Sequence, residues 1–292
     1  MELCYHYCSA ESFRLIIESS LFHLSSTHNM NDKGEGQFAL KILMSEIDNL
    51  KEIMSKQDDV YIEAFEAMKN RIISESNDRY ILCLSKHNDM LSQWRGYADD
   101  GKGLCIGLDM EAFGFEPTNK TEIPQINSSI FNKQSFNLNT VDYCDEELAI
   151  SKCKTLMKLF KSEMDNISDN QSQRFAGFYH LLSNILFMIK HVSFKEETEI
   201  RLMYNQNIHP TDNENSFQLS EDPNYIKQVK FKTRDSFLIP FVELNFKEIK
   251  KELIKEITLG PKNNFHESDI KLFLRANNLE HVKVSRSEST YR

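Results

Sequence analysis

The stretches YILCL (residues 80–84) and LCIGL (residues 104–108) decide the fold class of this chain. Each is a short apolar run of the length expected for a buried strand. Further strand patterns lie toward both ends of the chain, at residues 3–8, 21–24, 199–204, 228–232, 237–243, 256–259 and 281–284. Strands at both ends, with helical sequence between them, predict an α+β fold that has one mixed, mainly antiparallel sheet and a helical insertion.

The helical sequence falls into two main segments. Residues 37–75 carry apolar side chains three and four positions apart among many charges, and the helical pattern of residues 146–192 becomes strongly apolar after residue 175. A shorter helix is predicted at residues 267–276, and no internal repeat is visible. We therefore predict a single domain over residues 1–292, with the segments 37–75 and 146–192 packed on the sheet.

The composition excludes several classes of protein. The 292 residues carry 44 acidic and 35 basic side chains, a net charge of −9, which argues against a general duplex-binding protein. There is no run of 18 apolar residues, and the first residues, MELCYHYCSAES, lack the basic and apolar parts of a signal peptide. We expect a cytoplasmic protein without membrane association, whose six cysteines are thiols.

The first strand holds a candidate histidine. Alternation along it places Cys4, His6 and Cys8 on one face, and Tyr5 and Tyr7 on the other. Side chains on one strand face lie about 7 Å apart, too far for three of them to converge easily on one zinc ion. We predict no metal site, so that His6 is either a buried structural histidine or one that orients a ligand through hydrogen bonds.

A second candidate is the block LSQWRGYADDGKGLCIGLD at residues 91–109, which holds the only tryptophan, Trp94, followed by Arg95 and Tyr97. An aromatic ring and a guanidinium side by side can stack on and pair with a planar or anionic ligand. The alternative is that Trp94 anchors the core and Arg95 pairs with one of the two following aspartates. The glycines of this block do not have the spacing of a dinucleotide-binding loop.

The third candidate is FKEETEIRLMY at residues 194–204, which predicts a strand. Alternation would then place Glu197, Glu199, Arg201 and Met203 on one face. Two carboxylates beside a guanidinium can stabilise a developing positive charge and accept a hydrogen bond from a sugar hydroxyl. The alternative is an exposed edge strand that carries a Glu–Arg cross-pair.

Taken together, these blocks resemble a large and widely distributed bacterial family known only as a domain of unknown function. The family's motifs match this chain, in order, at residues 5–9 (YHYCS), 30–35 (MNDKGE), 91–103 (LSQWRGYADDGKG), 194–201 (FKEETEIR), 257–261 (ITLGP) and 289–292 (STYR). We also predict that Asn31 and Asp32 of the second motif are ligand-binding residues.

A histidine in the first strand, a helix, a second strand and a glutamate on a late strand also resemble the layout of ADP-ribosyltransferases. This resemblance implies that NAD is a substrate and that His6 holds one of its ribose groups. It implies that Glu199 binds the ribose 2′-hydroxyl and stabilises the oxocarbenium-like transition state as nicotinamide leaves. Glu197 would activate an acceptor.

The same resemblance implies roles for the remaining candidates. Tyr97 or Tyr7 would stack on the nicotinamide ring, and Arg95 or Arg201 would neutralise the diphosphate.

Two classes of function remain open on the sequence. The first is an NAD-consuming, ADP-ribosyltransferase-like effector of a bacterial defence or toxin system, with a protein or nucleic-acid acceptor left open. The second is a non-catalytic module that senses a nucleotide or other ligand, or binds a partner, with His6, Trp94 and Arg95 lining the pocket. A nuclease is disfavoured because the sequence has no DxD or HxH metal-binding cluster.

Overall fold

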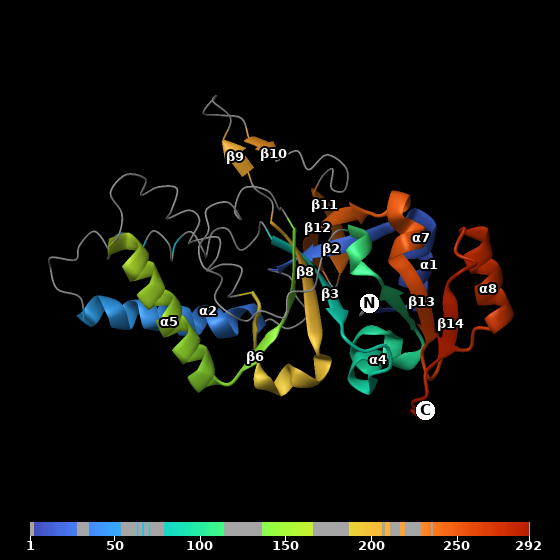
Figure 1. Cartoon of the computed structure of the whole chain (residues 1–292), viewed down its shortest axis with the longest axis horizontal. Helices are drawn as coiled ribbons and strands as arrows, with labels where there is room; N and C mark the ends of the chain where they lie inside the picture. Colours follow the sequence, from blue (N-terminus) through green and yellow to red (C-terminus); the bar gives the residue numbers. More distant parts are fainter. Residues whose placement is uncertain are drawn as a thin grey trace.

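A computed structural model of the chain describes residues 3–27, 35–53, 63, 66, 70, 79–113, 136–165, 187–205, 208–210, 217–219, 229–234 and 236–291. These residues form helices and a ten-stranded sheet that is mixed and mainly antiparallel (Figure 1). The predicted α+β fold class is therefore confirmed.

The large sheet has the order β11-β12-β2-β3-β1-β4-β13-β14, and β8 and then β5 extend from β3. Its strands are β1 (Cys4–Cys8), β2 (Leu21–Ser26), β3 (Arg79–Ser85), β4 (Leu104–Leu108), β5 (Phe136–Thr140), β8 (Glu199–Asn205), β11 (Val229–Arg234), β12 (Phe237–Asn245), β13 (Ile254–Leu259) and β14 (Lys283–Arg286). Only the β13–β14 pair among them is parallel. Two smaller sheets pair β6 (Asp142–Cys144) with β7 (Ile189–His191) and β9 (Ile208–Pro210) with β10 (Phe217–Leu219).

Strand β3 joins the parts of the large sheet. Along its whole length it pairs with β8, from Arg79 opposite Asn205 to Ser85 opposite Glu199. It also pairs with β2 near its beginning and with β1 at its end, where Ser85 lies opposite Tyr5. The apolar run that predicted this strand is buried on both faces, as expected for a strand with neighbours on all sides.

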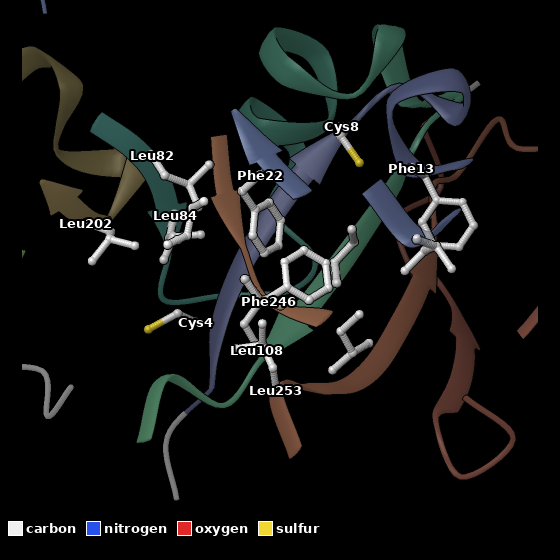
Figure 2. Packing of buried hydrophobic residues seen from close by; sticks show 14 of the residues in the cluster. Cys4, Cys8, Phe13, Phe22, Leu82, Leu84, Leu108, Leu202, Phe246 and Leu253 are labelled. Atoms are coloured by element: carbon white, nitrogen blue, oxygen red, sulfur yellow. The ribbon is translucent and has the colours of Figure 1, made fainter. Parts of the chain in front are cut away.

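The main core lies on one face of the sheet. Figure 2 shows Phe22 and Phe246 at its centre, with Leu202 and its neighbours to one side and Phe13 to the other. The rings of Phe22 and Phe246 are 4.7 Å apart, a distance at which aromatic pairs add to the energy of burial.

Helices cover both faces. Helix α1 (Ala10–Ser19) begins at Ser9, whose hydroxyl accepts a hydrogen bond from the Ser12 N–H at 3.1 Å. It packs its buried residues into the main core, as does α8 (Glu267–Ala276), which confirms the helix predicted at 267–276. Helix α4 (Leu91–Tyr97) covers the opposite face, followed by η4 (Asp99–Gly101). The short elements η5 (Met110–Phe113), η7 (Lys247–Ile249) and α7 (Lys250–Leu253) connect strands.

Each of the two segments predicted to be helical contains a helix in the described residues. Helix α2 (Glu35–Ile53) occupies the first half of the segment 37–75, and α5 (Glu146–Asp165) the first half of 146–192. Most of the remaining residues of both segments lie outside the described part. The end of the second segment was predicted wrongly, because residues 189–191 form β7 and residues 192–197 form a 3-10 helix, η6 (Val192–Glu197).

Helices α2 and α5 pack against each other, and α2 also packs against β7. Within the described residues, no helix is both long enough and apolar enough to span a bilayer. All six cysteines are free thiols.

Close backbone approach explains the glycine at position 103. A Cβ atom there would lie 2.1 Å from the carbonyl oxygen of Cys8 and 3.0 Å from that of Ala98. The Gly103 N–H donates to Ala98 at 2.8 Å, and its carbonyl accepts from the Gly260 N–H at 3.1 Å. Gly103 therefore joins α4, β1 and the end of β13 at a point where no side chain fits.

We expect Gly103→Ala to lower the free energy of unfolding by about 3 kcal/mol or more, because the backbone atoms that it meets cannot move aside. The matched control is Gly96→Ala in α4, where nothing lies within 4 Å of the added methyl group. This control should raise stability by about 0.5–1 kcal/mol, as alanine does in a helix. Urea unfolding of both variants measures the difference, and equal stabilities would contradict the packing described here.

Candidate functional site

The register of the sheet separates the two residues expected to form the centre of a catalytic site. Directly paired residues of neighbouring strands project from the same face. Ser85 lies opposite both Tyr5 and Glu199, so Tyr5 and Glu199 share a face. His6 follows Tyr5 in the strand and therefore projects from the other face, toward the main core.

The surroundings of His6 agree with this placement. Its ring lies edge-to-face with Phe22 at 5.6 Å, and its Nδ1 lies 3.3 Å from the carbonyl oxygen of Cys83. Burial lowers the pKa of His6 below the ordinary value of 6.5. Of the two alternatives for His6, the surroundings favour the buried structural histidine. The expectation that His6 and Glu199 line one site is wrong, because the sheet lies between them.

The segment expected to be one strand is divided at Thr198. Residues 192–197 form η6, and β8 begins only at Glu199. Thr198 between them has φ 45° and ψ 46°, in the left-handed region that a β-branched residue rarely enters. Glu197 is therefore not on the strand with Glu199, contrary to prediction. The turn nevertheless directs both carboxylates to the same partner.

That partner is Lys190 of β7, whose side chain is 2% exposed. Its ammonium donates to the Glu197 carboxylate and lies 3.3 Å from Oε2 of Glu199. It also lies 4.6 Å from the centre of the Phe194 ring, a cation–π contact. Lys190 was not among the residues predicted from the sequence. The available signal was that Lys190 is the only Lys, Arg, Asp or Glu in the apolar stretch 175–192.

Arg201 completes the inner end of the network. Its Nε and Nη2 donate to the two carboxylate oxygens of Glu199 at 2.8 and 2.9 Å, and its Nη1 donates to the Phe187 carbonyl at 2.5 Å. Such a bidentate pair is strong and geometrically specific. Glu199 and Arg201 thus lie side by side as alternation predicted, in a buried pair and not on an exposed edge.

The charges around Glu199 decide its protonation. Burial by itself would raise the pKa of this carboxyl group, but the Arg201 guanidinium and the Lys190 ammonium outweigh burial and hold the pKa below its ordinary value of 4.5. Tyr143 accepts a hydrogen bond from the Glu199 N–H at 2.8 Å, and burial raises the pKa of Tyr143 to about 12. Glu199 is ionised and its carboxylate oxygens are occupied.

The outer end of the network is Tyr97, at the end of α4. Its hydroxyl donates to Oε1 of Glu197 at 3.3 Å, and the residue is 39% exposed. Burial of the ring's inner part, and then the Glu197 charge, raise the pKa of Tyr97. The Glu197 side chain is 16% exposed, against 7% for Glu199. The network Tyr97–Glu197–Lys190–Glu199–Arg201, here called the charge chain, thus runs from the surface into the protein.

Trp94 and Tyr7 belong to the core and not to this site. Trp94 is fully buried, its indole N–H donates to Asp89 at 2.6 Å, and its ring lies edge-to-face with Tyr7 at 4.7 Å. The Tyr7 hydroxyl donates to the His87 carbonyl at 2.8 Å. The structure therefore supports the core-anchor alternative for Trp94, and the expected platform for a planar ligand is not formed.

Arg95 is exposed on α4, with its guanidinium carbon 5.8 Å from the centre of the Tyr291 ring. Asp100 is paired with Lys262 at 2.8 Å and with the Tyr291 hydroxyl at 2.7 Å. Of the two aspartates considered as partners of Arg95, Asp100 is therefore bonded to other residues. Two positions separate Arg95 from Tyr97 in the helix, so their side chains project from different sides.

Of the remaining candidates, Asn31 and Asp32 lie outside the described residues. Within the described residues, no group of three or more His, Cys, Asp or Glu side chains is arranged to hold a metal ion. The structure thus brings together Glu197, Glu199, Arg201 and Tyr97 from the predicted set and adds Lys190 and Tyr143.

We expect Glu199→Gln to lower the free energy of unfolding at pH 7 by about 3–5 kcal/mol, because it leaves Arg201 and Lys190 buried without their counter-charge. The lowered pKa means that the unfolded chain takes up a proton at Glu199 before the folded protein does. The contribution of this carboxylate is therefore full above its ordinary pKa and is lost as the pH falls through the lowered folded value.

Urea unfolding of the wild type and of Glu199→Gln at pH 7, and in steps from about pH 5 to 3, measures this effect. The difference between them should shrink below about pH 4.5. Glu196→Gln removes an exposed carboxylate nearby and should change stability by less than about 0.5 kcal/mol. A difference between wild type and Glu199→Gln that stays constant with pH would contradict the ion pairing described here.

Comparison with known proteins bears on this part of the chain. No curated protein and no solved structure matches the chain. A family model described as a protein of unknown function (DUF2971) matches residues 93–202. The match covers somewhat more than a third of the chain and includes every residue of the charge chain. The motifs at residues 5–9, 30–35, 257–261 and 289–292 lie outside it. Residues 93–202 are therefore similar to an uncharacterised protein family, in agreement with the family resemblance of the sequence.

Proposed function

We propose that the chain is a ligand-binding module that takes a hydroxyl-bearing small molecule, of the nucleoside or nucleotide class, at Tyr97 and Glu197. The observation that carries the proposal is the direction of the charge chain. Its buried end is neutralised by the pair of Glu199 with Arg201, while its outer end presents a tyrosine and a carboxylate at the surface.

The chemistry of the outer end suits a sugar hydroxyl. One oxygen of Glu197 is held by Lys190, and the other is 3.3 Å from the Tyr97 hydroxyl, a long hydrogen bond that a ligand hydroxyl can replace. An ionised carboxylate makes stronger hydrogen bonds than a neutral acceptor does. The Tyr97 ring beside it offers an aromatic surface for a base or a sugar.

The backbone at Thr198 supports a functional reading of this end. A left-handed conformation at a threonine costs about 1–3 kcal/mol, and such conformations persist where the surrounding structure requires them. Here the conformation allows Glu197 to reach Lys190, although Glu199 in the adjoining strand already binds the same ammonium. The strained conformation of Thr198 therefore serves to position Glu197, which is more exposed than Glu199.

A second candidate function is the cleavage of NAD by an ADP-ribosyltransferase-like reaction. The specific observation in its favour is the pair of carboxylates that meet at one lysine on a late strand, beside a tyrosine. In this reading Glu197 takes the role first assigned to Glu199, because the oxygens of Glu199 are occupied by Arg201 and Lys190. His6 has no part in it.

Calorimetric titration with adenosine, ADP-ribose and NAD tests the binding proposal. We expect at least one of them to bind the wild type and to bind Glu197→Gln about 10–100-fold more weakly, because a hydrogen bond to a charged group is lost. Tyr97→Phe should weaken the same ligand. The matched control Glu196→Gln, a change of the same charge at the exposed neighbouring position, should bind as the wild type does. Equal affinities of Glu197→Gln and Glu196→Gln would refute the site.

Nicotinamide release separates the two candidates. A binding module leaves NAD unchanged, whereas an enzyme releases free nicotinamide at a rate proportional to the protein concentration. In that case Glu197→Gln should abolish the release, and His6→Gln, if it folds, should retain it. Wild-type protein that binds NAD and releases no nicotinamide would exclude the enzyme reading and leave the binding proposal intact.

A further inference from the structure

Arg79, the first residue of β3, is a buried cation with hydrogen-bond donors that have no acceptor among the described residues. The residue is 4% exposed. Within the part of the chain that the structure describes, its Nε and Nη1 atoms are buried and have no hydrogen-bond partner. Together these two nitrogens carry three of the five N–H donors of the guanidinium.

Such a group is unusual in a folded protein. The guanidinium stays charged at any ordinary pH, and a buried charge without a partner is costly. Buried polar groups as a rule have partners, so a buried donor left without one calls for an explanation. The aromatic ring of Phe187, 5.1 Å from the guanidinium carbon of Arg79, supplies a cation–π contact but no acceptor for N–H groups in the guanidinium plane.

Arg201 on the same face of the sheet provides the comparison. Cys83 lies opposite Arg201 and Arg79 opposite Asn205, so the two arginines project from the same face, four residues apart in register. Arg201 has a carboxylate on two of its nitrogens and the Phe187 carbonyl on the third. Both arginines thus contact Phe187, yet only Arg201 has its oxyanion within the described chain.

We propose that Arg79 is the anion-binding residue of a ligand site, and that it takes an oxyanion of the phosphoryl or carboxylate kind. Arginine is suited to both groups because its planar fork of N–H donors matches two oxygens at once. The unused donors of Arg79 would then be satisfied by the ligand, as those of Arg201 are satisfied by Glu199. This site goes beyond the ligand proposed for Tyr97 and Glu197 and does not depend on it.

Arg79→Met provides the test, because it removes the guanidinium and keeps an unbranched side chain among apolar neighbours. Without an oxyanion in the buffer, two nitrogens of the buried Arg79 guanidinium have no acceptor among the described residues. The variant should therefore melt at the same temperature as the wild type or higher. Inorganic phosphate at about ten times its Kd, with ionic strength held constant by NaCl, should raise the Tm of the wild type by about 2–3 °C. The Tm of Arg79→Met should not change.

Two further variants serve as controls. Arg95→Met removes an exposed guanidinium and should respond to phosphate as the wild type does. Arg79→Lys keeps the charge without the planar fork and should bind phosphate more weakly than the wild type. It also keeps the test open should Arg79→Met fail to fold. Acetate in place of phosphate distinguishes the two kinds of oxyanion, and a larger response to phosphate assigns the site to a phosphoryl group.

Two outcomes would overturn the proposal. One is a phosphate-dependent rise in Tm that is equal in the wild type, Arg79→Met and Arg79→Lys, since it would show that the anion binds elsewhere. The other is a wild type that responds to neither phosphate nor acetate, while Arg79→Met loses stability in the absence of both. That result would assign Arg79 to packing on Phe187 alone.

Discussion

Strand β3 imposes the constraint on which the rest of this structure depends. It pairs with β8 along its length, with β2 at its beginning and with β1 at its end. Because paired residues share a face, the single row Tyr5–Ser85–Glu199 fixes which side chains of three strands lie together. One face of the sheet packs on the main core, and the face from which this row projects carries α4 and the charge chain.

The charge chain is best understood by where its charges are neutralised. Removing one partner of the buried Glu199–Arg201 pair would strongly destabilise the protein, because the other charge would remain buried alone. The intact pair, however, adds little stability over apolar side chains packed in its place. Its value lies in position, because Lys190 is held between this pair and Glu197. Because Lys190 contacts both Glu199 and Glu197, the fixed position of the buried pair also fixes the position of the Glu197 carboxylate, which remains partly accessible. Binding of the proposed ligand at the outer end would therefore need no rearrangement of the inner end.

The strands and part of the site were predictable from local pattern. Short apolar runs gave β3 and β4, the latter with the bounds observed. Alternation correctly placed Glu199 and Arg201 side by side, since both lie within one strand. It failed for Glu197, because the left-handed turn at Thr198 ends the 3-10 helix and changes the direction of the chain. Lys190 was missed, since the apolar sequence around it resembles a buried helix and the residues next to it form a strand.

The sequence by itself determined the α+β class, the positions of most strands and the two faces of each strand, because these follow from the period of the apolar residues. Only the tertiary structure decided which faces of different strands coincide. His6 and Glu199 stand on opposite sides of the sheet because β1 meets β3 with Tyr5 opposite Ser85. A shift of that register by one residue would have placed them together. Strand register is set by long-range pairing and core packing, which no local pattern of residues contains.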